Sequence, residues 1–361
     1  MMLRVLHVLE TCGAGGIETT FLNVLTAWRR QAAWAVHDVW AMAGGALAPA
    51  LAATATRLVV SSDAIDAQRL IATGYDVVHV LFDRPAHQWI PFIAAHSDAA
   101  LVYGKGYDVA GTFRLNDGVR WQPDESLMWG CDAVTFTTSA LASGYSMPSQ
   151  RRAILGKAAD VRRFLALPPV DAHTPDRIVC IANLHALKRL PDLLAAVARL
   201  VSRHPDVRVR FVGADDSGEG QRLRQLAAQL GIGDRCEITG RHDDVAADLA
   251  AARVFALPSG REGVPTAMLE AMAAARPVVV TDVGHIASVV RDGVEGFLVP
   301  VGETGLLEAR LHILLSDRGR AATMGDAARR RAAHHDVAVV AARLRETLES
   351  AAARVRRGAA A

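Results

Sequence analysis

Two glutamates, Glu262 and Glu270, stand eight positions apart in the stretch from Arg261 to Gly284. The spacing alone carries no chemistry, because two other glutamate pairs in the chain have the same separation. The residues between them are more informative, since Gly-Val-Pro follows Glu262 and proline is favourable at the first position of a helix, where its missing N–H would be unpaired anyway. We therefore expect a helix that begins near Pro265 and ends by Arg276.

The first turn of that helix is a candidate anion site. Its free backbone N–H groups, at Thr266, Ala267 and Met268, and the positive end of the helix dipole would bind a phosphate group. Glu262 precedes this turn and can reach hydroxyls on whatever the phosphate carries, whereas Glu270 can accept two hydrogen bonds from neighbouring hydroxyls such as those of a ribose. The pair suits a polyhydroxylated phosphate ester, and the alternative is a capped surface helix with two solvated glutamates.

In this context the sequence resembles a known family, the retaining glycosyltransferases of family 4 with the GT-B fold. The matching residues are PSGREGVPTAMLEAMAAARPVVVTDVG, followed by VVRDGVEGFLVP, and the resemblance extends upstream from CIANLHALKRL to RCEITG. It implies that Glu262 contacts the donor sugar, Glu270 the ribose, and Lys188 the diphosphate. A cation there would stabilise the leaving group as the glycosidic bond breaks. The further donor-binding residues that the resemblance implies are Asn183, Gly213, Gly263, Val264, Pro265 and Thr266.

A glycine-rich stretch follows the first apolar run in RVLHVLETCGAGGIETTFLNVL. A dinucleotide fingerprint is a weak interpretation, because Glu18 stands where that motif has Gly or Ala. The family instead has Gly-Gly-x-Glu, matched by Gly15, Gly16 and Glu18. The two glycines would let the backbone approach the donor phosphates. The alternative is an ordinary glycine turn.

Two positions depart from the family pattern. Asn183 replaces an arginine that commonly binds phosphate, so one expected cation is missing. Lys105 lies where a histidine-glycine commonly contacts the sugar, and we assign Lys105 and Glu18 to the acceptor or sugar side. The alternative for Lys105 is an exposed loop lysine. In GKAAD, ahead of the linker, Asp160 survives from the family's usual motif, as does Phe164 beyond it.

Short β-branched runs alternate with longer Ala/Leu helical patterns, which is typical of parallel α/β architecture. Two such series, with a proline-rich linker from Phe164 to Arg177 between them, predict two doubly wound domains that face each other across a cleft. We expect an acceptor-side domain at 1–168, a nucleotide-sugar domain at 169–335 and a C-terminal helix at 336–361 that packs back on the first domain.

Composition limits the classes of function. The 361 residues carry a formal charge of +2, which argues against a dedicated nucleic-acid binder. The four cysteines are scattered without metal-ligand spacing, and the sequence contains no Asp-x-Asp motif. We therefore expect no metal and no cofactor besides the nucleotide sugar. The first residues lack a signal sequence, and no run suits a membrane span. Trp28 and Trp34, with Arg29 and Arg30, could anchor a helix at an anionic membrane, although an ordinary amphipathic helix is the preferred interpretation.

The sequence therefore predicts a retaining, metal-independent hexosyltransferase in the cytoplasm or at the inner face of the membrane. Its partners would be a UDP- or GDP-linked sugar and a glycan or lipid-linked hydroxyl acceptor, in cell-surface polysaccharide or glycolipid synthesis. By the resemblance, the leaving diphosphate oxygen takes the acceptor proton and no enzyme nucleophile is required. Two alternatives are a catalytically silent nucleotide-sugar-binding partner subunit, suggested by Asn183 and Lys105, and an enzyme that isomerises a nucleotide sugar.

Overall fold

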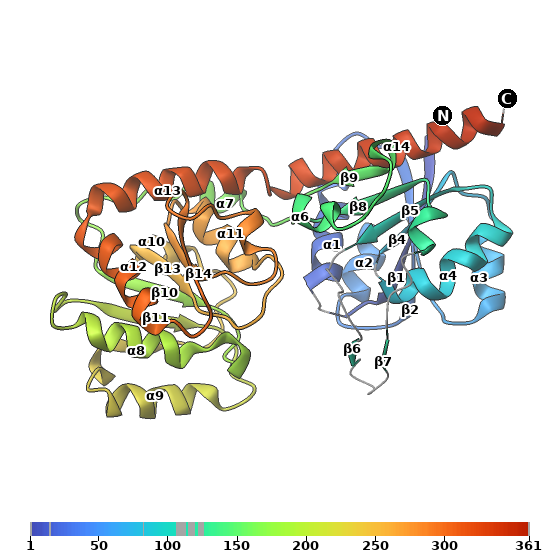
Figure 1. Cartoon of the computed structure of the whole chain (residues 1–361). Helices are drawn as coiled ribbons and strands as arrows, with labels where there is room; N and C mark the ends of the chain where they lie inside the picture. Colours follow the sequence, from blue (N-terminus) through green and yellow to red (C-terminus); the bar gives the residue numbers. More distant parts are fainter. Residues whose placement is uncertain are drawn as a thin grey trace. The chain divides into compact units, whose positions relative to one another are not determined.

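The computed structural model describes residues 2–13, 16–81, 83–105, 113–114, 120–121 and 126–359 (Figure 1). Contacts within the chain divide it into two units. Unit 1 contains Met1–Ala158 together with Val337–Ala361, and unit 2 contains Ala159–Asp336. Each unit has its own large parallel sheet with flanking helices, so the predicted α/β fold with two domains is confirmed.

The sheet of unit 1 has seven strands in the order β3-β2-β1-β4-β5-β8-β9. All its strand pairs are parallel, and the central strands are buried along most of their length, which explains their apolar sequences. A separate antiparallel pair joins β6 (Phe113–Arg114) and β7 (Arg120–Trp121). The strands of the main sheet are β1 (Leu3–Thr11), β2 (Ala35–Ala43), β3 (Arg57–Val60), β4 (Val77–Leu81), β5 (Ala100–Lys105), β8 (Ala133–Phe136) and β9 (Arg152–Ile154).

The helices of unit 1 include the long C-terminal helix α14 (Val337–Ala359), which contacts α1 and the strands β4, β5 and β8. Leu344 and Leu348 of α14 are buried in the same hydrophobic cluster as Trp28, whose indole Nε1 donates to the carbonyl of Ala341 at 3.0 Å. The predicted return of this helix to the N-terminal domain is therefore confirmed. The other helices are α1 (Gly16–Arg29), α2 (Ala48–Thr54), α3 (Ala64–Ile71), α4 (Asp83–His96), α5 (Ser126–Trp129), α6 (Ser139–Ser143) and the short η1 (Ser149–Arg151).

The sheet of unit 2 has six parallel strands in the order β12-β11-β10-β13-β14-β15. Helix α11 (Thr266–Ala273), almost entirely apolar, packs against α13 and against the short helix α7. The strands are β10 (Arg177–Ile181), β11 (Arg208–Val212), β12 (Cys236–Ile238), β13 (Val254–Leu257), β14 (Val278–Thr281) and β15 (Gly296–Val299). The other helices are α7 (Arg162–Leu165), η2 (Ala186–Lys188), α8 (Leu190–Leu200), α9 (Glu219–Gln229), η3 (Gly233–Arg235), α10 (Ala246–Ala250), η4 (Ile286–Ser288), α12 (Thr304–Ser316) and α13 (Arg318–Ala333).

The division between the units falls after Ala158, ahead of the position after Pro168 expected from the sequence. The residues between these positions pack into unit 2, because Phe164 is fully buried in its core. The buried guanidinium of Arg276 donates to the carbonyl oxygens of Leu249 at 2.7 Å and Pro168 at 2.8 Å. The prolines thus end regular structure without ending the core, and the apolar residues ahead of them decide to which unit the segment belongs.

Candidate functional site

The candidate site lies at the carboxyl ends of the central strands of unit 2. β10 is the first strand of this sheet in the sequence, and it pairs with β11 on one side and β13 on the other. The chain therefore leaves β10 toward one edge of the sheet and later fills the other edge from β13. In a doubly wound sheet such a switch point between neighbouring strands is the usual position of a ligand. The loops that follow β10 and β13 contain Lys188 and Glu262.

Lys188 and Glu262 are in direct contact, although 74 positions separate them. The ammonium Nζ of Lys188 donates to Oε1 of Glu262 at 2.6 Å. The side chains are 25% and 10% exposed, respectively, so the pair is accessible from solvent but largely surrounded by protein. An ammonium has three N–H donors, and the contact with Glu262 occupies one of them. The two residues that the sequence predicts as catalytic are thus placed together, with donor capacity left on the lysine.

Two hydroxyl groups hold Glu262 from the strand side. Ser259 Oγ donates to the same Oε1 atom at 2.6 Å, and Thr281 Oγ1 donates to the carbonyl of Ser259 at 2.5 Å. Gly260 N–H donates to the carbonyl of Leu187 at 2.8 Å, which joins the loop after β13 to the turn that carries Lys188. Ser259 is fully buried. These bonds fix the carboxylate and the ammonium on neighbouring loops, so that neither depends on a flexible tip.

The turn that presents Lys188 has an unusual backbone. Lys188 ends the short helix η2, and Arg189 then takes φ +50° and ψ +38° before α8 begins. This left-handed conformation costs a non-glycine residue roughly 1–2 kcal/mol. Arg189 Nε donates to Asp192 Oδ2 at 2.7 Å, and this bond helps to hold the conformation. Local backbone strain of this kind is concentrated at functional sites.

Two glycines allow close backbone contacts around the pair. A Cβ atom on Gly213, after β11, would lie 1.9 Å from the carbonyl oxygen of Ala182. A Cβ atom on Gly284, after β14, would lie 1.9 Å from the carbonyl oxygen of Glu262, and Gly284 also has a positive φ of +57°. Only glycine fits at either position. Loops from four strands therefore close on one small region at the same end of the sheet.

The helix after Glu262 starts one residue later than predicted. Pro265 is the N-cap, with φ −65° and ψ +127°, and α11 spans Thr266–Ala273. The predicted end by Arg276 agrees with the structure, since the C-cap is Ala274. Pro265 provides no side-chain cap, so the first N–H groups of α11 have no capping side chain to bind. The predicted anion site at Thr266 thus retains its donors.

Glu270 lies in α11 with an unusual electrostatic environment. Burial raises the pKa of its carboxyl group to about 7, with smaller contributions from Arg163, which lowers it, and from Asp160 and Asp244, which raise it. Arg163 and Asp244 form an ion pair at 3.4 Å. Within the described part of the chain, the carboxyl group of Glu270 forms no hydrogen bond or ion pair. A carboxyl group held in this condition can accept hydrogen bonds from a ligand without first breaking a bond to protein.

The remaining predicted donor residues of unit 2 lie in loops at the same end of the sheet as Lys188 and Glu262. Asn183 is exposed in the loop after β10. Its backbone nitrogen lies close to Gly213, at 3.0 Å from the position of a Cβ atom added there. Gly263 accepts from the N–H of His285 at 3.3 Å, and Val264 is half-buried between Gly263 and the helix start. The structure thus places all these residues in the loops after β10, β11 and β13.

The predicted residues of unit 1 occupy the corresponding end of its sheet. Gly15 lies outside the described residues, and Gly16 is the first residue of α1. Glu18, in the first turn of α1, accepts from Thr11 Oγ1 at 3.3 Å, and Thr11 Oγ1 also accepts from the N–H of Gly13 at 3.0 Å. These contacts hold the start of α1 against the end of β1.

Lys105 is not the exposed loop lysine that the sequence left open. It is the last residue of β5 and is only 2% exposed. It pairs in register with Phe136 of β8, and its ammonium lies 5.7 Å from the ring centroid of Tyr145. The β-strand and the aromatic neighbour explain the burial, because a lysine stem can pack along apolar surface.

Trp28 of α1 and Trp34, which follows the helix, do not form a membrane anchor of exposed tryptophans. Trp28 is 3% exposed and Trp34 is 9% exposed, and the two rings pack edge to face with centroids 5.2 Å apart. Arg29 and Arg30 are exposed. Trp28 therefore lies on the buried face of the amphipathic helix preferred from the sequence, whereas Trp34 lies beyond the end of α1 and is buried in the same core cluster.

Several residues that position Glu262 were not singled out from the sequence. Ser259 and Thr281 end or follow strands, and Gly284 belongs to the quoted motif without an assigned role. A serine three residues before Glu262, in the loop after a buried strand, is the signal that could have indicated Ser259. The Thr281 hydroxyl binds the main-chain carbonyl of Ser259, and Gly284 lies against that of Glu262, and the sequence reveals neither contact.

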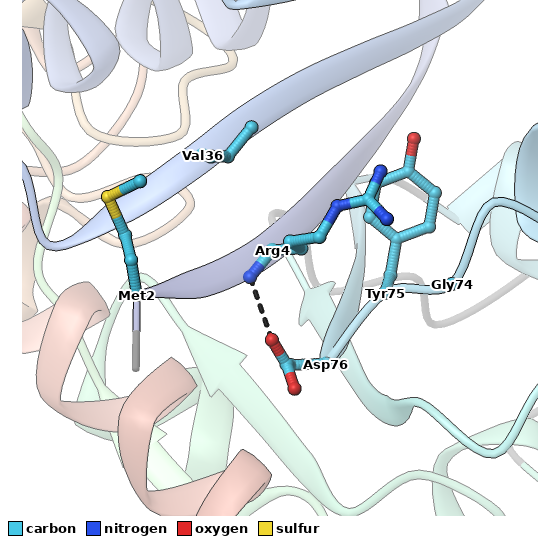
Figure 2. Close-up of a pocket in the computed structure, with 6 residues that line it drawn as sticks. All are labelled: Met2, Arg4, Val36, Gly74, Tyr75 and Asp76. Atoms are coloured by element: carbon cyan, nitrogen blue, oxygen red, sulfur yellow. Dashed lines mark hydrogen bonds between the residues drawn. The ribbon is translucent and has the colours of Figure 1, made fainter.

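A hollow lies in unit 1 at the end of the strands opposite to the end that Gly16 and Glu18 follow (Figure 2). It has a volume of about 630 Å³ and is lined by Met2, Arg4, Val36, Gly74, Tyr75 and Asp76. Figure 2 shows the backbone N–H of Arg4 bound to Asp76, at 2.8 Å, and the Arg4 guanidinium over the ring of Tyr75. Asp76 also accepts from Arg356 of α14 at 2.5 Å. The Arg4 guanidinium also donates to the carbonyl of Thr73, so both charged groups of the lining already have protein partners and we assign this hollow a structural role.

Among the described residues, no group of three or more His, Cys, Asp or Glu side chains is arranged to hold a metal ion. Across the same ranges, no helix combines the length and the apolar character that crossing a bilayer requires.

Comparison with known families places the candidate site in context. Residues 175–317, which include Lys188, Glu262 and Glu270, match the family described as Glycosyl transferases group 1. The chain contains a glycosyl transferases group 1 domain. This confirms the resemblance drawn from the sequence for that part of unit 2.

The chain is similar in sequence to curated proteins over part of their length. The chain is 33% identical over 247 residues to a D-inositol 3-phosphate glycosyltransferase of Streptomyces bingchenggensis, covering 66% of this chain and 52% of the relative. It is 34% identical over 152 residues to an N-acetyl-alpha-D-glucosaminyl L-malate synthase of Bacillus anthracis, covering 42% of this chain and 39% of the relative. The chain thus spans about half or less of these curated relatives.

Solved structures resemble the whole chain in fold. Anabaena HepE in complex with UDP has a TM-score of 0.77 at 20% identity, with 96% of this chain and 100% of that chain covered. A glycosyltransferase from Rickettsia africae has a TM-score of 0.78 at 16% identity, with 97% and 98% covered. The lipopolysaccharide outer core galactosyltransferase WaaB has a TM-score of 0.74 at 16% identity, with 96% and 99% covered. Together with the two parallel sheets, these likenesses confirm the GT-B fold.

Proposed function

We propose that this protein is a glycosyltransferase that moves a sugar from a nucleoside-diphosphate sugar to a hydroxyl group. The observation that carries the proposal is the contact of Lys188 with Glu262, at 2.6 Å, at the switch point of the sheet and inside the matching domain. A cation and a carboxylate held side by side suit a ligand that joins a charged diphosphate to a polar sugar. The complexes of HepE with UDP and with UDP-glucose support a nucleotide sugar as the donor class.

The reaction would break the bond between the anomeric carbon and the diphosphate oxygen. The acceptor hydroxyl oxygen forms the new bond to that carbon, and its proton passes to the leaving diphosphate oxygen. Lys188 and the first N–H groups of α11 stabilise the negative charge that develops on the diphosphate. Glu262 binds hydroxyls of the sugar and Glu270 those of the ribose. The resemblance favours retention of the anomeric configuration, and no enzyme nucleophile takes part.

The proposed reaction requires no metal ion, because an ammonium and main-chain amides supply the charge stabilisation. The donor base would be uracil or guanine, and the acceptor a glycan or lipid-linked hydroxyl of a cell-surface polymer or glycolipid. The names of the curated relatives, which include a D-inositol 3-phosphate glycosyltransferase and an N-acetyl-alpha-D-glucosaminyl L-malate synthase, equally allow a small hydroxylated acceptor. A screen that includes both small hydroxylated acceptors and glycan or lipid-linked acceptors distinguishes these two classes.

The first experiment is a thermal-shift screen with UDP, GDP and ADP. A ligand present at 100 times its Kd stabilises the native state by about 2.7 kcal/mol, so the matching nucleotide should raise the Tm. The second is turnover of the corresponding nucleotide sugars with and without a panel of acceptors, detected as released nucleoside diphosphate. Activity that persists in EDTA and is lost in Lys188→Ala supports the proposal. No nucleotide binding, or binding only outside unit 2, contradicts it.

A nucleotide-sugar-binding partner subunit without transferase activity is the second candidate. Asn183, exposed in the loop after β10, stands where related enzymes commonly have a phosphate-binding arginine, and this observation favours it. The test is Asn183→Arg. If the protein binds a nucleotide sugar but releases no diphosphate with any acceptor, and Asn183→Arg restores release, the wild-type chain is the binding subunit. Release by the wild type supports the enzyme.

A further inference from the structure

A second charged region lies in unit 1, along the outer edge of its sheet. β9 is the last strand of that sheet and pairs only with β8. Between β9 and α14 runs a groove of about 300 Å³. Its charged lining residues are Arg151, Arg152, Arg343 and Arg354, against the single carboxylate of Glu346. The charge of the whole chain is only +2, so this lining is a local concentration of cations.

Three of these arginines are oriented by main-chain carbonyl groups. Arg151 donates to Trp129 at 3.2 Å, Arg343 to Leu155 at 2.9 Å and Arg354 to Asp132 at 3.0 Å. A carbonyl group directs a guanidinium but carries no formal charge, so it does not neutralise it. Among the residues that the structure describes, Arg151, Arg152 and Arg354 form no ion pair with a carboxylate.

Arginines elsewhere in this protein are held in two ways: Arg276 is held by main-chain carbonyls, as in the groove, whereas Arg210 is held by carboxylates. Arg210 of β11 donates to Glu237 at 2.7 Å and to Asp248 at 2.9 Å. Like charges that line one groove repel one another, and the repulsion is strongest where protein excludes water and counter-ions. Arg151, Arg152 and Arg354 lie together in this groove without an ion pair to a carboxylate among the described residues, and this arrangement prepares a surface for an anion from outside.

The chemistry of the groove indicates which anion. Guanidinium groups bind phosphate and carboxylate oxygens through two parallel N–H bonds, and several guanidinium groups together favour the more highly charged phosphate. We propose that the groove between β9 and α14 binds a phosphate-bearing ligand. The described residues assigned to the donor and sugar site belong to unit 2, to α1 or to β5, and none of them lines the groove, so this is a separate site.

The phosphate group could belong to a soluble ester or to the headgroup of an anionic lipid. Ile154, which lines the groove, is 45% exposed, and Trp129, whose carbonyl binds Arg151, is 53% exposed. Exposed apolar side chains next to cations also suit a bilayer surface. The shared chemistry is the phosphate group, and two probes distinguish its sources.

The experiment compares two charge-matched double variants of the full chain. Arg151→Ala with Arg152→Ala removes two cations from the groove, whereas Arg29→Ala with Arg30→Ala, the α1 variant, removes two exposed cations at the C-terminal end of α1 and just after it. The soluble probe is inorganic pyrophosphate, titrated calorimetrically. All proteins for this probe carry Lys188→Ala, so that the proposed donor site contributes little. The lipid probe is co-sedimentation with phosphatidylglycerol–phosphatidylcholine vesicles, compared with pure phosphatidylcholine vesicles.

The expected result is binding of one probe that the groove variant loses by at least about tenfold and the α1 variant keeps. Loss confined to pyrophosphate assigns a soluble phosphate ester, and loss confined to anionic vesicles assigns a lipid headgroup. An Arg151→Lys, Arg152→Lys variant keeps the charge and controls for a change in folding, together with unchanged Tm values. The proposal is overturned if neither probe binds, or if the α1 variant weakens binding as much as the groove variant.

Discussion

A Cβ atom on Gly284 would lie 1.9 Å from the carbonyl oxygen of Glu262, so the loop after β14 lies directly against the residue that carries the candidate carboxylate. Gly284→Ala should therefore displace Glu262 and lower kcat/KM by more than tenfold, because a shift of about 1 Å in a positioned group can cost on the order of 100-fold in rate. The measurement is nucleoside diphosphate release at saturating acceptor.

The matched control for this substitution is Gly293→Ala. Gly293 also has a positive φ, of +78°, but nothing lies within 4 Å of an added Cβ atom. Both variants incur the left-handed backbone strain of roughly 1–2 kcal/mol, whereas only Gly284→Ala creates the clash. Equal kinetic losses in the two variants would show that strain alone is responsible and that the contact with Glu262 is unimportant.

Lys188 is predicted to act mainly on the chemical step. Lys188→Ala should lower kcat on the order of 100- to 1000-fold, which is the usual cost of removing one group that stabilises developing charge. Glu262→Gln should chiefly raise KM for the donor, because it retains an oxygen acceptor but loses the charge. Steady-state kinetics of both single variants and the double variant test whether the two residues act as a coupled pair. Strictly additive effects would contradict the coupling that their 2.6 Å contact implies.

Glu270 should make donor binding depend on pH. Burial raises its pKa to about 7, so the carboxylate that accepts ribose hydroxyls is populated above this pH and lost below it. Between pH 8 and pH 6 the ionised fraction of one such group falls about tenfold, and the affinity for a nucleotide sugar should weaken by up to about the same factor. A nucleotide sugar is the better ligand here, since it has no terminal phosphate that titrates in this range.

Glu270→Gln provides the control for that pH dependence. The variant should bind the donor with an affinity nearly independent of pH between 6 and 8. It should also raise the stability of the fold at pH 8, because the wild type must hold an ionised carboxylate in a buried position there. Donor binding measured calorimetrically at the two pH values decides the point, and a variant with the wild-type pH profile would assign the dependence to another group.

The sequence predicted the elements of the site better than their contacts. The helix after Glu262 and the loop with Lys188 were accessible, because proline position, apolar runs and a strong motif are local signals. The contact between Lys188 and Glu262 depends on β10 and β13 being neighbours in the sheet, and no local pattern determines strand order. Likewise, the sequence left open whether Lys105 is an exposed loop lysine, and pairing with β8 makes it the buried end of a strand.

The boundary between the units shows the same limitation. Pro168 and Pro169 are strong signals for the end of regular structure, yet Phe164 ahead of them belongs to the core of unit 2. Proline acts through its own backbone, whereas membership of a domain depends on where neighbouring apolar side chains are buried. The raised pKa of Glu270 was also inaccessible, since it depends on the depth of α11 and on carboxylates from distant segments.

A chain of three histidines on the sheet of unit 1 should make this unit sensitive to acid. His7 Nε2 lies 3.0 Å from His37 Nδ1, and His7 Nδ1 lies 3.2 Å from His79 Nδ1. Burial is the main cause that lowers the pKa of His37 to about 4, of His79 to about 3, and of His7 well below its ordinary value. In the folded state these rings are neutral at pH values where the unfolded chain is protonated.

The sign of the effect follows from this difference in proton binding. Stability is fully present above about pH 6.5, where neither state is protonated, and it falls as the pH decreases toward the folded pKa values, by up to about 1.4 kcal/mol per pH unit for each histidine. All six tryptophans lie in unit 1, and Trp28 stacks on His37 with ring centroids 4.8 Å apart, so urea unfolding followed by tryptophan fluorescence reports on this unit. His37→Gln should reduce the slope of stability against pH between 6.5 and 5 by about one proton, whereas His173→Gln, at an exposed position of unit 2, should leave it unchanged. Wild-type stability that is equal at pH 7.5 and pH 5 would show that these rings do not remain neutral in the folded protein.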